Sequence, residues 1–116
     1  MDPDVAAEPF CYLMTRGRRS GRPHEIEIWF ALAGDTFFLL SGGGEAADWV
    51  RNLRAEPAVT VRVGVTVWPG RARVVADDDE AGRARRLVFE KYQPGYGGSL
   101  TRWRDTALPV AIDVQS

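Results

Sequence analysis

The residues most able to do chemistry are gathered in one short turn, where positions 17–22 read Gly-Arg-Arg-Ser-Gly-Arg. Three guanidinium groups this close repel one another, and exposed pairs with nearby acids return only about 0–1 kcal/mol each. Arginine presents a planar fork of donors that fits phosphate oxygens, and a serine hydroxyl and glycine N–H groups add donors. The turn therefore indicates a phosphate site, with a merely solvated basic turn as the alternative. We expect the phosphate to be held by Arg18, Arg19, Ser20, Gly21 and Arg22.

A glycine run followed by a helical pattern is the second candidate site. Positions 41–44 read Ser-Gly-Gly-Gly, and apolar residues then recur at the spacing of one helix face, at Ala46, Trp49, Val50 and Leu53. A helix N-terminus can bind an anion, but this segment has neither the spacing of a dinucleotide fold nor the lysine of a P-loop. The glycines either permit a tight exit from a strand or leave room for a flat ring against the backbone. Both interpretations stay open.

Aromatic residues near the end of the chain form the third candidate site. Tyr96 lies between glycines, which is a mobile setting for a large side chain. It would either cover an aromatic ligand, with its hydroxyl as a hydrogen-bond or proton donor, or pack in the core. Tyr92 precedes it by four residues, and we expect Trp103 to be a packing residue.

Few other residues offer chemistry. His24 is the only histidine and Cys11 the only cysteine, so no zinc cluster is expected, and no serine lies in a G-x-S-x-G motif. Glu25 and Glu27 share one face of a strand, and we expect them to pair with the arginines of the turn. The acidic run 77–80 is interpreted as the start of a helix rather than a metal site. A phosphate site with few nucleophiles predicts that a cofactor supplies the chemistry.

The elements that position these residues follow from the apolar periodicity. Alternating patterns predict strands, and patterns of period 3.6 predict helices. The predicted order is β-β-β-α-β-β-α-β, with strands at 10–15, 24–32, 36–41, 59–63, 64–75 and 108–114, helices at 46–55 and from 77 onward, and one helical turn at 99–105. Short connections favour an antiparallel sheet with added helices, a mainly β fold of the α+β class. Closing that sheet into a barrel would remove its unpaired edges.

Size and composition predict a single domain spanning residues 1–116, long enough to bury a core without disulfides. The net charge of -1 argues against a nucleic-acid partner, because nonspecific binding needs a broad positive field. No apolar run approaches the roughly 20 residues of a membrane span. The first ten residues lack the features of a secretory signal, and the lone cysteine suits a reducing compartment, so we expect a cytoplasmic protein.

Two segments together resemble the deazaflavin-dependent nitroreductase family. Positions 12–23, Tyr-Leu-Met-Thr-Arg-Gly-Arg-Arg-Ser-Gly-Arg-Pro, are similar to its opening motif, and positions 41–57 are similar to its second. The resemblance implies a split β-barrel like that of the pyridoxamine-phosphate oxidase superfamily. It also implies an oxidoreductase that passes a hydride from reduced coenzyme F420, an 8-hydroxy-5-deazaflavin, to a small electron-poor acceptor. Quinones, enones and nitro compounds are the expected acceptors.

The same resemblance assigns roles to residues. The arginine-rich turn would meet the phosphate of the coenzyme. The ring would lie near the segments 24–28 and 41–43, bordered by the helix of Trp49 and Asn52, and either Tyr92 or Tyr96 would position or protonate the acceptor. The expected cofactor ligands thus add His24, Ser41, Gly42, Gly43, Trp49 and Asn52 to the residues of the turn.

Two alternatives remain for the function. The first is a reductase of the same fold that uses FMN. The second is a carrier that binds a flavin or a haem-like ligand without turnover. Relatives of this fold often pair across the barrel, so the resemblance also implies a homodimer.

Overall fold

Within residues 3–115, seven strands pair in one antiparallel sheet, in the order β2-β1-β5-β6-β7-β4-β3. The coordinates are those of a computed structural model, which describes residues 3–115. The strands are β1 (Cys11–Arg16), β2 (Pro23–Ile28), β3 (Ala31–Ala33), β4 (Thr36–Ser41), β5 (Ala58–Val63), β6 (Thr66–Val74) and β7 (Leu108–Val114). The helices are α1 (Pro3–Ala7), α2 (Asp48–Ala55), α3 (Asp78–Tyr92) and α4 (Thr101–Thr106), with short 3-10 turns η1 (Gly44–Ala46) and η2 (Gln93–Gly95).

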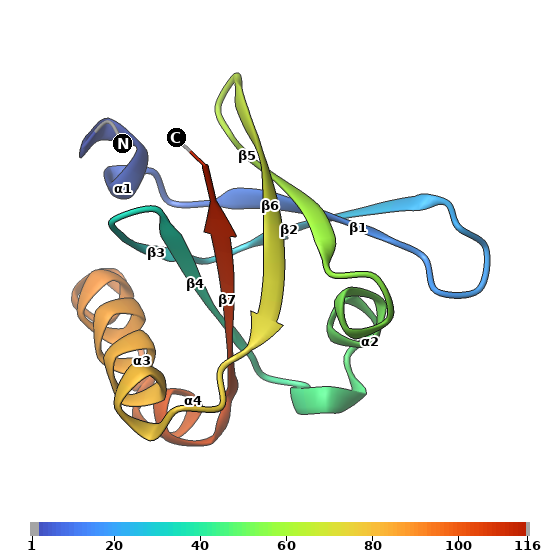
Figure 1. The fold of residues 1–116 in the computed structure, drawn as a ribbon. Helices are drawn as coiled ribbons and strands as arrows, with labels where there is room; N and C mark the ends of the chain where they lie inside the picture. Colours follow the sequence, from blue (N-terminus) through green and yellow to red (C-terminus); the bar gives the residue numbers. More distant parts are fainter. Residues whose placement is uncertain (1–2, 116) are drawn as a thin grey trace.

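The sheet curls into a half-barrel whose two edge strands follow one another in the chain (Figure 1). β2 and β3 lie at opposite edges, and within residues 3–115 no ladder of hydrogen bonds joins them. The predicted antiparallel α+β sheet is therefore confirmed, and it is split between these two strands. The closing strand is observed where it was predicted.

The prediction of one continuous strand at residues 24–32 is wrong. The chain leaves the sheet at Trp29–Phe30 and forms two strands instead of one. The backbone of Phe30 is satisfied by side chains of α3: its N–H donates to the Tyr92 hydroxyl at 3.0 Å, and its carbonyl accepts from Lys91 Nζ at 3.0 Å. These partners replace the ladder hydrogen bonds of a continuous strand. The observed order therefore contains one strand more than predicted, and it also begins with the unpredicted helix α1.

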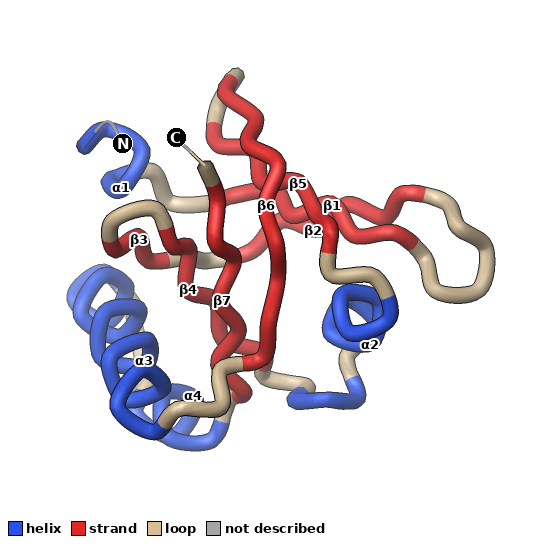
Figure 2. Tube along the Cα trace, viewed as in Figure 1, coloured by secondary structure: helices blue, strands red, loops and turns tan. Residues whose placement is uncertain are grey.

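Strand β4 is buried on both faces and divides the core into two layers. Phe37 and Leu39 face the inside of the barrel, where α2 adds Val50 and Leu53. The alternate residues Phe38 and Leu40 face the opposite side, which α3 and α4 cover (Figure 2). This double burial explains why the strand reads as a continuous apolar run.

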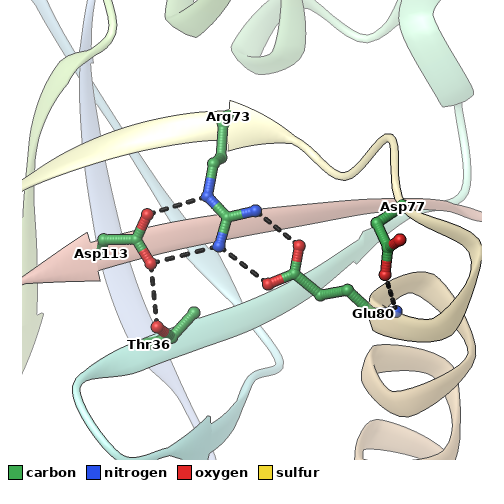
Figure 3. A network of polar contacts seen from close by, with 5 residues as sticks. All are labelled: Thr36, Arg73, Asp77, Glu80 and Asp113. Carbon is green, nitrogen blue, oxygen red and sulfur yellow. Dashed lines mark hydrogen bonds and ion pairs between the residues drawn. The ribbon is translucent and has the colours of Figure 1, made fainter.

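A polar network ties α3 to the sheet (Figure 3). Arg73 on β6 donates to both carboxylate oxygens of Glu80. Its Nε also donates to Asp113 Oδ2 on β7, at 2.8 Å. Thr36 on β4 donates to Asp113 at 2.8 Å. Hydrogen bonds from Arg73 hold the pKa values of the Glu80 and Asp113 carboxyls below their ordinary range. Asp77 caps the helix by accepting from the Glu80 N–H at 2.8 Å, so the acidic run starts a helix as predicted.

Candidate functional site

The arginine turn, residues 17–22, is closed by its own hydrogen bonds. The Gly17 N–H donates to the Arg22 carbonyl at 2.7 Å, and the Gly21 N–H donates to the Gly17 carbonyl at 2.8 Å. Gly21 has a φ of 72°, which other residues rarely adopt. The Arg22 N–H donates to Ser20 Oγ at 3.1 Å. These bonds give the turn a defined shape although it projects at one side of the sheet (Figure 1).

Helix α2 holds the arginine turn in place. The Arg18 N–H and guanidinium both donate to Asn52 Oδ1, at 3.2 and 2.8 Å, and the guanidinium also contacts Asp48 at 3.3 Å. Asn52 is buried, and its Nδ2 donates to Thr15 Oγ1 at 3.3 Å. A buried amide with all of these partners fixes the orientation of the turn relative to the helix.

A surface hollow of about 310 Å³, the arginine hollow, lies between the turn and α2. Its lining brings together five of the predicted phosphate and ring ligands with two further residues: Gly17, Arg18, Arg19, Ser20, His24, Asp48 and Asn52. The imidazole of His24 lies over the backbone at position 17, where an added Cβ would come within 2.7 Å of its Nε2. A larger residue at position 17 would therefore have to displace the exposed side chains of His24 and Ser20.

Several donors in the arginine turn have no partner within residues 3–115. These are the guanidinium groups of Arg19 and Arg22 and the backbone N–H groups of Arg19 and Ser20. Ser20 accepts one hydrogen bond, so its hydroxyl proton is left to donate elsewhere. The only carboxylate in the lining, Asp48, is already paired with Arg18. This donor set suits an anion with several oxygens.

The glycine segment after β4 makes a tight exit from the strand. The buried hydroxyl of Ser41 donates to the Gly44 carbonyl at 3.0 Å, and Gly44 has a φ of 61°. Gly42 and Gly43 are exposed, and an added Cβ at Gly42 would lie 3.5 Å from Trp103 Nε1. Room for a flat ring against these glycines stays a prediction. Trp49, the other residue expected near that ring, is half-buried against the barrel core.

The aromatic residues surround Trp29, which follows β2. Tyr92 stacks on Trp29 with ring centroids 4.3 Å apart and planes inclined by 3°. Tyr96 and Trp103 meet it edge to face, at 6.0 and 5.7 Å. A second hollow of about 610 Å³, the aromatic hollow, is lined by Trp29, Tyr96, Ser99, Leu100, Arg102, Trp103 and Thr106.

The two tyrosines expected at the acceptor have different surroundings. The Tyr92 hydroxyl contacts the carbonyls of Pro9 and Phe30, at 2.8 and 3.1 Å, besides accepting from the Phe30 N–H. Burial raises the pKa of Tyr92 to about 12. Tyr96 is 47% exposed and lines the aromatic hollow. The arrangement leaves Tyr96 open to a ligand and commits Tyr92 to the backbone.

The predicted pairing of Glu25 and Glu27 with the arginine turn is wrong. Glu27 accepts from the Tyr12 hydroxyl at 2.6 Å, and Glu25 contacts Arg62 on β5 at 3.5 Å. Tyr12 stands on β1, which pairs with β2, and Arg62 stands on β5, the next strand on the far side of β1. Cross-strand neighbours are closer to these carboxylates than the turn beyond the end of the strand.

Sequence reasoning missed part of both hollows. The sequence did not mark Trp29 or Asp48 as site residues, and Trp103 was expected only to pack. Leu100 and Arg102 carried no signal, because the aromatic hollow forms only where the segment 96–106 folds against Trp29, which is distant in the sequence. Within residues 3–115 no cluster of three or more His, Cys, Asp or Glu side chains could hold a metal ion, and no helix is long and apolar enough to cross a membrane.

The chain has relatives among known proteins. Residues 4–115 match the family model described as F420H2-dependent quinone reductase. An F420H2-dependent quinone reductase of Mycobacterium tuberculosis H37Rv is 28% identical over 93% of this chain and 73% of its own length.

Solved structures share the fold. An F420-H2-dependent reductase superposes with a TM-score of 0.71 at 23% identity, covering 92% of this chain and 94% of the other. A candidate pyridoxamine 5'-phosphate oxidase from Listeria innocua superposes with a TM-score of 0.71 at 16% identity, covering 97% and 88%. These likenesses confirm the predicted split barrel of the pyridoxamine-phosphate oxidase type.

Proposed function

The chain belongs to the F420H2-dependent quinone reductase family, and from that premise we propose that it passes a hydride from reduced coenzyme F420 to a quinone, an enone or a nitro compound. Membership in the family makes the protein an oxidoreductase and F420 its cofactor. We propose the identity of the acceptor and the residues that act on it. We also propose that residues 1–116 form a single functional domain.

The arginine hollow is the proposed site for the phosphate of the coenzyme. Arg19 and Ser20 offer unpartnered donors there, and Arg18 is held at its edge by Asn52. Each charge-assisted hydrogen bond to the phosphate contributes roughly 1.5–3 kcal/mol. The fit is supported by chemistry, since the hollow gathers cations and N–H groups around a single carboxylate that is already paired.

The deazaflavin ring is proposed to lie between the glycine segment and the end of β2. Exposed backbone at Gly42 and Gly43 offers a surface without side chains, and His24 borders the path from the arginine hollow. The bound coenzyme supplies the hydride. The residues of this chain bind the phosphate, orient the ring and exclude water from it.

The aromatic hollow is proposed to hold the acceptor. Trp103 connects this hollow with the glycine segment, because its indole lies against Gly42. Tyr96 is the proposed residue that positions the acceptor or donates a proton to it. Tyr92 is the proposed support, since its stacking and its bonds to backbone groups fix the position of Trp29.

A titration tests the cofactor and its anchor together. The protein should bind F420 more tightly than FMN, and Arg19→Ala should weaken F420 binding by about tenfold or more, the loss of one charge-assisted contact. The Arg19 side chain makes no hydrogen bond or ion pair within residues 3–115, so its removal should leave the melting temperature unchanged. Arg86→Ala, which removes an exposed arginine on α3, is the matched control. Equal effects of the two variants would contradict the site.

Turnover separates the proposed enzyme from the alternatives. The absorbance of reduced F420 should fall only when a quinone, enone or nitro compound is added. A carrier would bind F420 without oxidising it under any of these conditions, and an FMN reductase would prefer the other cofactor. We also propose a homodimer, a choice supported by a fold relative at 24% identity that is described as a domain-swapped dimer. Light scattering at several protein concentrations would decide it.

A further inference from the structure

The aromatic hollow contains one charged side chain, and its sign is positive. Of its seven lining residues, four are large and apolar or aromatic, two are hydroxyl residues and one is Arg102. Its volume of about 610 Å³ falls within the usual range of small-molecule sites, and such sites use a few polar groups to orient a mostly apolar ligand. The charge of Arg102 is therefore the strongest polar feature that a ligand in this hollow would meet.

Arg102 is not engaged elsewhere. Within residues 3–115 its exposed guanidinium has no hydrogen bond or ion pair. The neighbouring arginine on the same helix, Arg104, is committed to Asp105 at 2.8 Å and to the ring of Phe89 at 4.4 Å. The carboxylate of Asp105 on α4 is thus paired with Arg104 and not with Arg102.

The hydroxyl groups of Ser99 and Thr106 in the lining are also occupied. Thr106 donates to the Arg102 carbonyl at 2.7 Å, and Ser99 donates to Thr101 at 3.1 Å. A ligand oxygen in the hollow would therefore find a charged donor in the Arg102 guanidinium, beside the neutral hydroxyl of Tyr96. The rings of Trp29 and Trp103 stand at 87° to each other and form a corner against which a flat ring can lie.

We infer that the acceptor carries an acidic group, a carboxylate or sulfonate on a flat ring, and that Arg102 selects for it. This inference rests on the proposed function of the same hollow. The ring packs against Trp29 and Trp103 while the acidic group meets Arg102. The reduction itself is unchanged, because the acidic group lies outside the bonds that form and break.

Two quinones that differ in one charge test the inference: 1,4-naphthoquinone and its 2-sulfonate. Calorimetric titration of the protein without coenzyme should give a lower Kd for the sulfonate. Arg102→Gln should abolish that preference, a loss of about tenfold for one charge-assisted pair, and Arg102→Lys should restore part of it. Arg86→Gln, on α3 and outside the hollow, is the control. Equal affinities for the two quinones in the unmodified protein would overturn the inference.

Steady-state rates supply an independent readout. Arg102→Gln should raise the KM for the sulfonate and leave both the KM for the neutral quinone and the Kd for F420 unchanged. A rise in the Kd for F420 would assign Arg102 to the coenzyme and overturn the inference. If the protein turned over neither quinone but bound the sulfonate through Arg102, the proposed reductase function would fail while the anion preference stood.

Discussion

Arg18 donates twice to a single oxygen, Asn52 Oδ1, once from its backbone N–H and once from its guanidinium. These residues stand 34 positions apart, one in the turn after β1 and the other in the second turn of α2. Because both donors belong to one residue, the amide fixes the backbone of the turn as well as a side chain. The arginine hollow exists between two segments that this contact holds together.

Asn52→Ala should lower both stability and coenzyme affinity. It removes the acceptor of Arg18 and the donor to Thr15, and a buried hydrogen-bonding group left without a partner costs about 1–3 kcal/mol. Urea unfolding and an F420 titration measure the two effects. Asn52→Asp keeps the oxygen that Arg18 needs and should retain most of the affinity. An alanine variant that binds F420 normally would show that the turn keeps its shape without α2.

Arg73→Met should destabilise the protein by about 1 kcal/mol at neutral pH, because the network is a partly exposed cluster of ion pairs. The lowered pKa values of Glu80 and Asp113 set the pH dependence. The stabilisation is fully present above the ordinary values of 4.5 and 3.8, and it is lost as the pH falls through the lowered values of the folded state. Unfolding curves of the variant and the parent should therefore converge in acid.

Arg71→Met is the matched control for this experiment. Arg71 is exposed two residues earlier on β6, and within residues 3–115 its side chain has no hydrogen bond or ion pair. It should change stability little at any pH. A constant difference between Arg73→Met and the parent down to strong acid would contradict the role of the two carboxylates.

The Cys11 thiol should resist modification in the folded protein. It is fully buried, and burial raises its pKa to about 12, so almost no thiolate exists near neutrality. Treatment with a disulfide reagent such as DTNB at pH 8 should release no colour from the native protein and one equivalent after denaturation, since the chain has one cysteine. Rapid reaction under native conditions would indicate that β1 opens locally.

The parts of the fold that were predictable depend on local patterns. α2 ends two residues before Pro57, and α3 begins at the acidic run with Asp77 as its cap, because capping and proline effects act over a few residues. The break at Trp29–Phe30 was not predictable in this way. The bonds that replace the sheet ladder come from Lys91 and Tyr92, which lie 61 and 62 residues further along the chain.

The candidate site also has one part that local sequence patterns could predict and one part that they could not. The arginine turn was identified because its residues are contiguous and their charges have no local compensation. The aromatic hollow was seen only in part, since Tyr96 stood among glycines while Trp29 resembled an ordinary strand residue. Periodicity assigns a residue to a face, but it does not say which distant side chains will cover that face.

The strand order has a consequence for how the chain is assembled on the ribosome. β1 and β2 form one hairpin and β3 and β4 another, yet within residues 3–115 no ladder links these two hairpins; β5, β6 and β7 stand between them. Of the seven strands in that range, β7 comes last in the chain, and it is inserted between β6 and β4. Until β7 emerges from the ribosome, the other six strands form two separate sheets with open edges, so the barrel is completed by a slow, nonlocal pairing after β7 is translated.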